Sequence, residues 1–529
     1  LHQRILPDGW QDNIREFLDR EAAPVRRVTD QAGGQLVLEV PGITPPIKVA
    51  VWRVDVGKVP LYLLDTDIPE NTPQARAISS RLYTGDKEQR LVQEIVLGIG
   101  GRKVLSELGI DFSAVHLNEG HPSFALLERT REFIEDGLSF PDALARVRGT
   151  SVFTTHTPVA AGHDVFPAPL IDKYFSGYYP SLGIDRDTFL DLGRNPGDPA
   201  GVFNMAAFAL KFTAYHNAVS RNHGIVSRRM WNHLWPDLAL EKVPIDVITN
   251  GVHLPTWMNQ RMEGLFSKYI GPVCPHWQQE HDNPALWELI DEIPDKELWS
   301  LHVWLKAKLF NRIRERKRQR WASHLKEPLN LVADGLMLNP TVLTIGFARR
   351  FSSYKRADLI FHDPDRLKRI VTNRWLPVQI IFAGKAHPDD TEGKQILQRI
   401  YRYALTPEFA GRIAFVEDYG EQTAQYLVHG VDVWLNNPLP PMEACGTSGM
   451  KAALNGVLNC SIRDGWWLEG YNGKNGWAFG GEEWSPELDA MDAAELYTLL
   501  EKEIIPFYYN TAHDGIPLGW VKMMKESIR

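Results

Sequence analysis

The chain has little cysteine, with only Cys274, Cys445 and Cys460 among 529 residues. Three is an odd and sparse number, so a disulfide framework is excluded and a reducing, cytoplasmic environment is expected. No run of apolar residues approaches the ~20 that a membrane span requires. The first ten residues, LHQRILPDGW, also lack the charged-then-apolar pattern of a secretion signal.

No single sign of charge dominates the composition. The 58 basic and 66 acidic residues give a net charge of -8, whereas nucleic-acid binders usually present a basic face. We therefore expect neither nucleic acid nor a membrane as a partner. The hydrophobic share of 44% and the charged share of 23% are ordinary for a globular protein. A length of 529 residues exceeds what one core organises, so two or three domains are expected.

The C-terminal half alternates short apolar runs with helical stretches. This rhythm predicts βαβ units and a parallel sheet. The runs cover residues 341–347, 378–382, 412–416 and 431–435. Each run is followed by a polar or glycine-rich segment: Arg349-Arg350, Gly384-Lys385, Tyr419 and GTSGMK. Because ligands of such sheets bind beyond the carboxyl ends of the strands, these segments should converge on one edge.

The N-terminal half repeats the same pattern more loosely, with apolar runs at residues 114–117, 150–155 and 246–249. The predicted fold is therefore α/β, with two Rossmann-like lobes whose parallel sheets face each other across a cleft. The predicted segments are an N-terminal lobe (1–255), a helical connector (256–335), a C-terminal lobe (336–510) and a final helical segment returning to the first lobe (511–529).

The segment GTSGMK, residues 446–451, carries the most specific chemistry. Its small residues allow backbone N–H groups to approach an anion, and the helix that begins there adds a favourable dipole. Lys451 lies one short turn into that helix, where its amine is able to pair with a phosphate or to form a Schiff base. A tight turn with a surface lysine is the alternative.

A cluster of cations follows the first C-terminal strand, in GFARRFSSYKR. Arg349, Arg350, Lys355 and Arg356 lie within eight positions, which is costly unless something negative binds there. Arginine suits bidentate recognition of phosphate, and lysine supplies a point charge. The cluster indicates a phosphate site, with a solvated helix start as the alternative.

Four histidines, at positions 116, 121, 156 and 163, lie in HLNEGHPSF and FTTHTPVAAGH. Their spacing matches no metal-binding motif, so no metal is expected. His156 and Asn250 both follow predicted strands, and we expect them to hydrogen-bond a polar substrate.

Two superficial motifs fail on their context. The glycines of LGIGGRKVL, at positions 98, 100 and 101, follow a segment that is typical of a helix, whereas a dinucleotide loop follows a strand. The adjacent carboxylates Glu417 and Asp418 are expected to point apart on an extended segment, so no glycosidase pair is inferred.

In their order along the chain, NEGHPSFAL, TTHTPVAAGHDVF, ITNGVHLPTW, GFARRFSSYKRADL, FVEDYGEQTAQYL and EACGTSGMKAALNG resemble the α-glucan phosphorylases, in particular the shorter bacterial and archaeal branch. The resemblance covers nearly the whole chain. It departs from the better-known members at Ser448-Gly449, where they have Gly-Asn. The family's N-terminal glycine-rich loop has no counterpart, so the chain is expected to begin after it and to stop short of the final helices.

The resemblance implies a GT-B fold and a pyridoxal phosphate (PLP) cofactor bound to Lys451 as an imine. The cofactor phosphate would relay a proton to orthophosphate, which protonates the departing glucan oxygen and captures the glucosyl cation. Glycogen, starch or maltodextrin would thus release α-glucose 1-phosphate with retained configuration. The preferred glucan, allosteric control and the assembly, for which a homo-oligomer is one alternative, stay open.

The resemblance also implies roles for individual residues. The catalytic set is Lys451, Arg350, Lys355 and His156. The cofactor-binding set is Lys451, Thr447, Ser448, Gly449, Arg349, Tyr419 and Trp257. The substrate-binding set is Asn250, Glu443, Cys445, Gly446, Tyr354, Val219 and His121.

Two other functions stay open on the residues alone. A GT-B glycosyltransferase that uses a nucleotide sugar would also need arginine and lysine near a pyrophosphate, but it leaves Lys451 without an imine to form. A non-catalytic carbohydrate-binding or regulatory protein is the other alternative.

Overall fold

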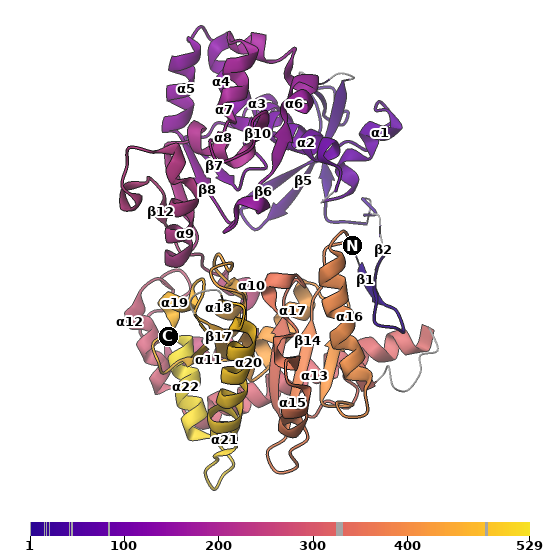
Figure 1. Cartoon of the computed structure of the whole chain (residues 1–529), viewed down its shortest axis with the longest axis vertical. Helices are drawn as coiled ribbons and strands as arrows, with labels where there is room; N and C mark the ends of the chain where they lie inside the picture. Colours follow the sequence, from indigo (N-terminus) through magenta and orange to yellow (C-terminus); the bar gives the residue numbers. More distant parts are fainter. Residues whose placement is uncertain are drawn as a thin grey trace. The chain divides into compact units, whose positions relative to one another are not determined.

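The computed structural model describes residues 2–14, 16, 18–20, 22–41, 43, 46–82, 85–323, 332–481 and 485–529. Its contacts divide the chain into two compact units (Figure 1). Unit 1 comprises Leu1–Glu16 and Asn250–Arg529, and unit 2 comprises Phe17–Thr249. The four segments predicted from the sequence, including the final segment's return to the first lobe, stay a prediction.

A six-stranded parallel sheet organises unit 1, in the order β15-β14-β13-β16-β17-β18. The strands are β13 (Leu343–Ala348), β14 (Val378–Ala383), β15 (Ile413–Val416), β16 (Val433–Asn436), β17 (Leu458–Ile462) and β18 (Gly476–Phe479). Every residue of β13 to β16 is buried. This explains their nearly continuous apolar sequence, since helices cover both faces of such a sheet.

The order of these strands reverses between β13 and β16, which pair directly. Ligands of doubly wound sheets bind at this reversal, beyond the carboxyl ends of the strands. The four strands predicted in this half are confirmed. The sequence did not reveal β17 and β18, because β17 carries the buried polar residues Asn459 and Ser461 and β18 begins with a glycine directly after the polar segment 472–475.

The helices of unit 1 pack around this sheet. They are α10 (Leu254–Trp257), α11 (Gln260–Tyr269), α12 (Pro284–Trp287), α13 (Asp295–Ser323), α15 (Pro364–Val371), α16 (Thr391–Leu405), α17 (Glu421–Gly430), α18 (Thr447–Ala453), α19 (Trp467–Gly470), α20 (Leu488–Leu499), α21 (Ile505–Tyr509) and α22 (Leu518–Ile528). The long helix α13 packs along α17. It contributes Lys306, whose ammonium lies 2.5 Å from the carboxylate of Asp432, and His302, at 2.8 Å from the same carboxylate. This ion cluster is fully buried.

An N-terminal hairpin, β1 (His2–Ile5) and β2 (Gln11–Ile14), belongs to unit 1. Gln3 and Gln11 are each 1% exposed. The Gln3 side chain donates to the carbonyl of Gly384 at 2.8 Å, and Gln11 exchanges two hydrogen bonds with the backbone of Ala386. The hairpin therefore provides hydrogen-bond partners for the backbone that directly follows β14.

Unit 2 contains a four-stranded parallel sheet in the order β12-β11-β8-β7. Its strands are β7 (Val115–Asn118), β8 (Ser151–Thr154), β11 (Tyr215–Ala218) and β12 (Asp246–Val247). Three of these, β7, β8 and β12, confirm the runs predicted in the N-terminal half. The α/β class with a parallel sheet in each half is thus confirmed.

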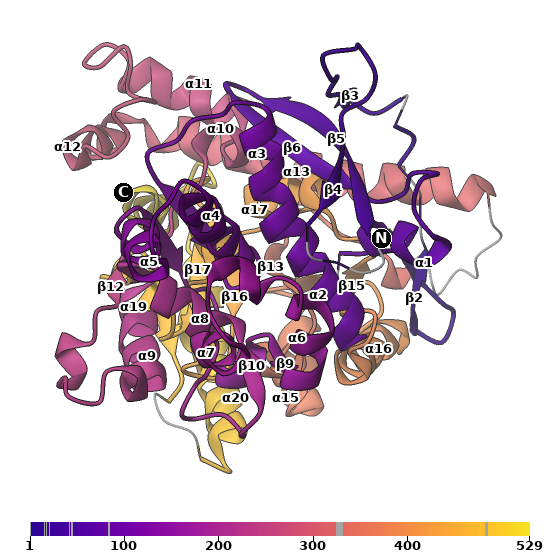
Figure 2. The same ribbon diagram turned by 90° about the horizontal axis from the view of Figure 1, so that it is seen from above.

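Antiparallel strands and helices complete unit 2. The strands are β3 (Arg26–Arg27), β4 (Val37–Val40), β5 (Ile47–Val56), β6 (Val59–Asp65), β9 (Val165–Pro167) and β10 (Val202–Asn204). Figure 2 shows β4, β5 and β6 lying together. The helices are α1 (Pro73–Arg76), α2 (Lys87–Ile95), α3 (Gly101–Glu107), α4 (Phe124–Glu135), α5 (Phe140–Gly149), α6 (Ala168–Phe175), α7 (Arg186–Leu192), α8 (Met205–Phe212) and α9 (Arg221–Trp231). Side-chain caps fix several starts, such as Ser139 for α5 and Ser220 for α9.

The glycines 98, 100 and 101 lie where α2 passes through one wide helical turn into α3. The segment directly before them is α2, which confirms the prediction that a helix rather than a strand leads into these glycines. A Cβ on Gly98 would lie 2.8 Å from the backbone of Ala125, so this glycine permits close packing against α4. Among the residues that the structure describes, no helix has the length and apolar character to cross a membrane.

Candidate active site

Lys451 lies in α18, whose first residue is Thr447. The preceding Gly446 has φ +88°, a left-handed conformation that glycine adopts without strain and that turns the chain into the helix. The Lys451 ammonium lies 3.8 Å from the centre of the Trp257 ring. Burial lowers the pKa of Lys451, and the charge of Glu421 opposes this shift only in part. The amine is therefore half-buried, beneath an aromatic face, and easier to deprotonate than a surface lysine.

The turn that carries Lys451 packs on β16 and β17. Ser448 accepts a hydrogen bond from the Trp434 indole at 3.2 Å. The Asn459 side chain donates to the carbonyl of Gly449 at 3.1 Å, and a Cβ on Gly449 would lie 2.6 Å from that side chain. A side chain at 449 would therefore have to displace the Asn459 amide, whereas glycine leaves it in place.

A buried ion cluster follows β13. The Arg349 guanidinium and the Lys355 ammonium both donate to one carboxylate oxygen of Glu443. Arg349 and Lys355 are each 7% exposed. Burial raises the pKa of Glu443, but the charges of Arg349 and Lys355 outweigh it and the net shift is downward. Two cations thus share one anion.

The cations of this cluster are not fully compensated. Burial, and next the charge of Arg349, lower the pKa of Lys355 to about 7, although Glu443 opposes the shift. The Nη1 atom of Arg349 is buried and has no hydrogen-bond partner. A buried donor without a partner is costly. The arrangement is thus suited to receive an anion.

Arg350 and two tyrosines lie close to this cluster. Arg350 is exposed, and its hydrogen bond to the Tyr354 hydroxyl partly offsets the burial that raises the pKa of that phenol. The Lys355 ammonium lies 4.6 Å from the centre of the Tyr354 ring. Burial raises the pKa of Tyr419 to about 12, and the charge of Arg349 opposes this. Tyr419 and Trp257 pack on the same apolar cluster around Trp434, so the Arg349 and Lys451 regions share one support.

Cys445 and Asn250 are also neighbours in unit 1. Burial raises the pKa of the Cys445 thiol to about 12, and the backbone N–H of Asn250 moderates this shift by a hydrogen bond. The carbonyl of Cys445 accepts from the Trp466 N–H at 2.8 Å. The backbone N–H of Glu443 donates to Asp464 at 2.8 Å. The loop from Glu443 to Gly446 is therefore fixed from both sides.

His156 and Val219 lie in unit 2, at the ends of β8 and β11. The His156 backbone N–H and the Thr157 hydroxyl donate to one oxygen of Glu119, at 2.7 and 2.9 Å. Burial lowers the pKa of His156, so its ring is neutral near pH 7. Val219 is buried, and its N–H donates to His223 at 3.3 Å.

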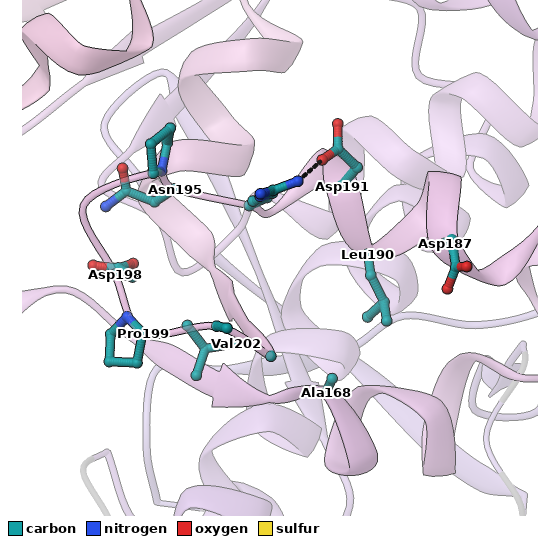
Figure 3. A pocket seen from close by; sticks show the side chains of 12 residues that line it. Ala168, Asp187, Leu190, Asp191, Asn195, Asp198, Pro199 and Val202 are labelled. Atoms are coloured by element: carbon teal, nitrogen blue, oxygen red, sulfur yellow. Dashed lines mark ion pairs between the residues drawn. The ribbon is translucent and has the colours of Figure 1, made fainter.

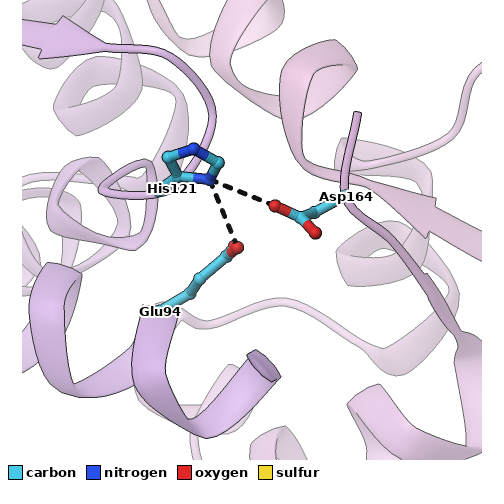
Figure 4. Close-up of side chains that lie close together, drawn as sticks. All are labelled: Glu94, His121 and Asp164. Carbon is cyan, nitrogen blue, oxygen red and sulfur yellow. Dashed lines mark hydrogen bonds and ion pairs between the residues drawn. The ribbon is translucent and has the colours of Figure 1, made fainter. Parts of the chain in front are cut away.

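His121, also in unit 2, lies between two carboxylates (Figure 4). Its Nδ1 lies 3.1 Å from Asp164 and 3.6 Å from Glu94. Hydrogen bonds to Asp164 and Glu94 raise the pKa of His121 to about 9, and burial raises the pKa of Glu94 to about 8. These three side chains have a spacing that suits a metal ion. The Arg90 guanidinium, however, contacts both carboxylates at 3.0 Å, so it occupies the place of a cation.

A separate pocket of about 340 Å³ in unit 2 contains none of the predicted residues (Figure 3). The acidic side chains Asp187, Asp191 and Asp198 line it, and Arg194 pairs with Asp191 at 3.5 Å. It gives no support to a catalytic role.

Two carboxylates differ from what the sequence suggested: Asp418 in its backbone conformation and Glu443 in its ion-pair partners. The interpretation of Glu417 and Asp418 as an extended pair is wrong at Asp418, which has φ +58°. The hairpin engages both: Ile5 N–H donates to Glu417 at 2.7 Å and Gln3 N–H donates to Asp418 at 3.0 Å. Sequence reasoning also missed that Glu443 is the shared partner of the buried cations, since nothing in a loop 88 positions beyond Lys355 signals an ion pair.

Comparisons with known proteins point to the same family as the sequence motifs do. The model of the carbohydrate phosphorylase family matches residues 195–482. A glycogen phosphorylase of Aquifex aeolicus is 50% identical over 529 residues, which is 100% of this chain and 76% of the relative. A maltodextrin phosphorylase of Thermococcus litoralis is 45% identical over 100% of this chain, and a glycogen phosphorylase of Mycobacterium tuberculosis is 40% identical over the same share. The chain spans 62% of the length of each of these two relatives.

Proposed function

Because the chain belongs to the carbohydrate phosphorylase family, we propose that it catalyses the reversible phosphorolysis of an α-1,4-glucan. The substrates are a glucan such as glycogen, starch or maltodextrin and orthophosphate, and the product is α-glucose 1-phosphate with retained configuration. Relatives with the names glycogen phosphorylase and maltodextrin phosphorylase support this choice. The observation that carries it is the buried cluster in which Arg349 and Lys355 share the single carboxylate of Glu443.

Phosphorylases of this family characteristically depend on PLP, and the residues around Lys451 fit this cofactor. A lysine that binds an aldehyde must present a neutral amine, and burial favours this form of Lys451. The unpartnered Nη1 of Arg349 suits the cofactor phosphate. The left-handed turn at Gly446, where no side chain intervenes, lets the backbone approach an anion. Lys451, Thr447, Ser448, Gly449, Arg349, Tyr419 and Trp257 would hold it.

When bound, PLP would supply a phosphate group that exchanges a proton with the substrate phosphate. The protein's own part is electrostatic. Arg350 and Lys355 bind the substrate phosphate, and Lys355 does so only while its Nζ carries a proton. Preorganised charges of this kind are commonly the largest contribution to catalysis, because they need no rearrangement during the reaction. Tyr354 orients Arg350 through the hydrogen bond between them.

The remaining predicted residues bind the sugar. Glu443, Cys445 and Gly446 lie on the fixed loop after β16 and would contact the sugar hydroxyls. Asn250 and the neutral ring of His156 would hydrogen-bond the 6-hydroxyl, and Val219 would form an apolar wall. His121, held by Asp164 and Glu94, would bind a further part of the glucan. These roles follow the family's pattern residue by residue.

The test is release of glucose 1-phosphate from maltodextrin by the purified protein, with orthophosphate and without any nucleotide. We expect release in the wild type, none in Lys451→Ala and at least about 100-fold less in Arg350→Ala, as for loss of one transition-state donor. Lys368→Ala, which removes an exposed lysine of α15, is the matched control and should keep full activity. Transfer that requires a nucleotide sugar would support the alternative glycosyltransferase and contradict the proposal.

A further inference from the structure

The backbone carbonyl of Trp257 accepts hydrogen bonds from two side chains. The Asn455 amide donates at 2.8 Å, and the His429 Nε2 atom lies at 3.0 Å. Asn455 follows α18, whereas His429 lies near the end of α17. A carbonyl oxygen has two lone pairs. Both lone pairs of the Trp257 carbonyl therefore have a donor, and the two donors are distant from Trp257 in sequence.

Asn455 links Lys451 and Trp257, the two residues whose side chains are in contact. Its Nδ2 atom donates to the carbonyl of Lys451 at 2.9 Å as well as to that of Trp257. Its Oδ1 atom accepts the backbone N–H of Asn259 at 3.0 Å. The side chain is fully buried. One amide group therefore fixes the backbone of Lys451 relative to the backbone of Trp257 and Asn259.

The protonation state of His429 fits the same purpose. Burial lowers the pKa of His429 to about 4, and the hydrogen bond to Trp257 opposes this only in part. The ring is therefore neutral at pH 7 and donates from Nε2, while Nδ1 faces the Asn259 amide at 3.4 Å. Gln425, one turn earlier on α17, donates to the carbonyl of Thr256 at 2.9 Å. Together Asn455, His429 and Gln425 form what we call the Trp257 clamp.

Such a clamp is needed because α10 is only four residues long. A single helical turn is unstable by itself, since its nucleation is unfavourable. The contact between the Trp257 ring and the Lys451 ammonium, at 3.8 Å, depends on where that turn is held. The surrounding hydrogen bonds thus determine how much water reaches the amine.

We propose that His429 and Asn455 are positioning residues, which hold the Trp257 indole over the Lys451 amine and so favour its reaction with the cofactor aldehyde. This inference rests on the proposed function and gives a role to two residues to which the family resemblance assigned none, although Asn455 lies within the motif EACGTSGMKAALNG. Neither side chain touches the reacting atoms. They act through the backbone of Trp257 and, for Asn455, also through that of Lys451.

The experiment compares variants of the cofactor-free protein. His429→Leu removes the donor to Trp257, His429→Gln keeps an N–H donor, and Asn455→Asp replaces a donor by a carboxylate of the same size. Leu367→Ala, a fully buried position on α15, lowers stability without touching the clamp. Each protein is mixed with PLP and quenched with borohydride at intervals, and the adduct on Lys451 is measured by peptide mass mapping. Urea unfolding gives the stability of each variant.

We expect capture at Lys451 to be about tenfold slower in His429→Leu and in Asn455→Asp, the factor for about 1.4 kcal/mol and thus for one buried hydrogen bond. His429→Gln should lie within about threefold of the wild type, as a retained donor predicts. Leu367→Ala should be destabilised yet capture at the wild-type rate. Equal rates in His429→Leu and the wild type would overturn the proposal, as would slowing in Leu367→Ala that matches its loss of stability. The His429 pair decides even where Asn455→Asp fails to fold.

A second readout does not need PLP. Acetic anhydride, which also reacts only with the neutral amine, should acetylate Lys451 several-fold more slowly in His429→Leu than in the wild type, because an amine that water reaches stays protonated to a greater extent. If the wild type fails to capture PLP at Lys451 but shows this difference, the positioning role stands and the proposed cofactor falls. If capture occurs and neither readout differs between variants, the cofactor stands and the positioning role falls.

Discussion

The buried amine of Lys355 should set an upper pH limit for phosphate binding. Its pKa of about 7 lies below the ordinary 10.5 because burial and the charge of Arg349 disfavour the ammonium form. At 1.36 kcal/mol for each pH unit, this difference corresponds to about 5 kcal/mol in favour of the neutral amine. In the free protein, half of the Lys355 side chains are charged near pH 7 and about a tenth at pH 8.

Lys355→Arg separates this ionisation from all others, since arginine stays charged throughout this range. The assay is the pH dependence of kcat/KM for orthophosphate in both proteins. Because the phosphate titrates identically in both, the ratio of variant to wild type isolates residue 355. We expect this ratio to rise about fivefold from pH 7 to pH 8, as the charged fraction of the lysine falls from one half to about a tenth. Lys368→Arg is the control, and a ratio for Lys355→Arg that is constant with pH would refute the reasoning.

The same ionisation acts on stability with a definite sign. Between pH 7 and 10.5 the unfolded chain keeps the Lys355 proton that the folded chain has lost. The unfolded state thus binds more protons, so this group makes the fold more stable as pH rises through that window. Below pH 7 both states are protonated, and the full cost of the buried charge is present.

Three further changes test the packing that supports the site. Asp432→Asn leaves the fully buried Lys306 without an anion, so we expect a loss of about 3–5 kcal/mol in urea unfolding. Gly465→Ala should lower the free energy of unfolding by about 1–3 kcal/mol more than Gly473→Ala. Both glycines have positive φ, but only at 465 would the added Cβ meet a backbone carbonyl oxygen, at 2.3 Å. Equal thermal denaturation midpoints of the two variants would contradict this. Gln11→Ala removes the acceptor of the Ala386 N–H, and hydrogen exchange of that amide should become about tenfold faster.

The sequence allowed the strands of the central sheet to be predicted, because strands that are buried on both faces, such as β13 and β14, are almost entirely apolar. The same logic predicted that Arg349 and the GTSGMK turn belong near one another, since β13 and β16 meet at the reversal of strand order. The fold class and this edge of the sheet therefore followed from local pattern alone.

Features that depend on contacts between residues distant in sequence could not be predicted from local pattern. The hairpin at residues 2–14 packs through buried glutamines on Gly384 and Ala386, and no periodicity reveals which partner a buried glutamine has. The cluster of Arg90, His121 and Asp164 assembles residues from three separate segments. The left-handed conformation of Asp418 becomes intelligible only once the backbone of Gln3 is seen to bind its carboxylate.

The central claim is that a half-buried lysine beneath an indole, in the same unit as a cluster with an excess of buried cations, binds PLP. Borohydride reduction of the freshly purified protein, followed by peptide mass mapping, tests it most directly. We predict a pyridoxyl group on the peptide that contains Lys451 and none on Lys451 of a sample left unreduced. An unmodified Lys451 peptide after reduction, in protein that had been supplied with PLP, would contradict the account.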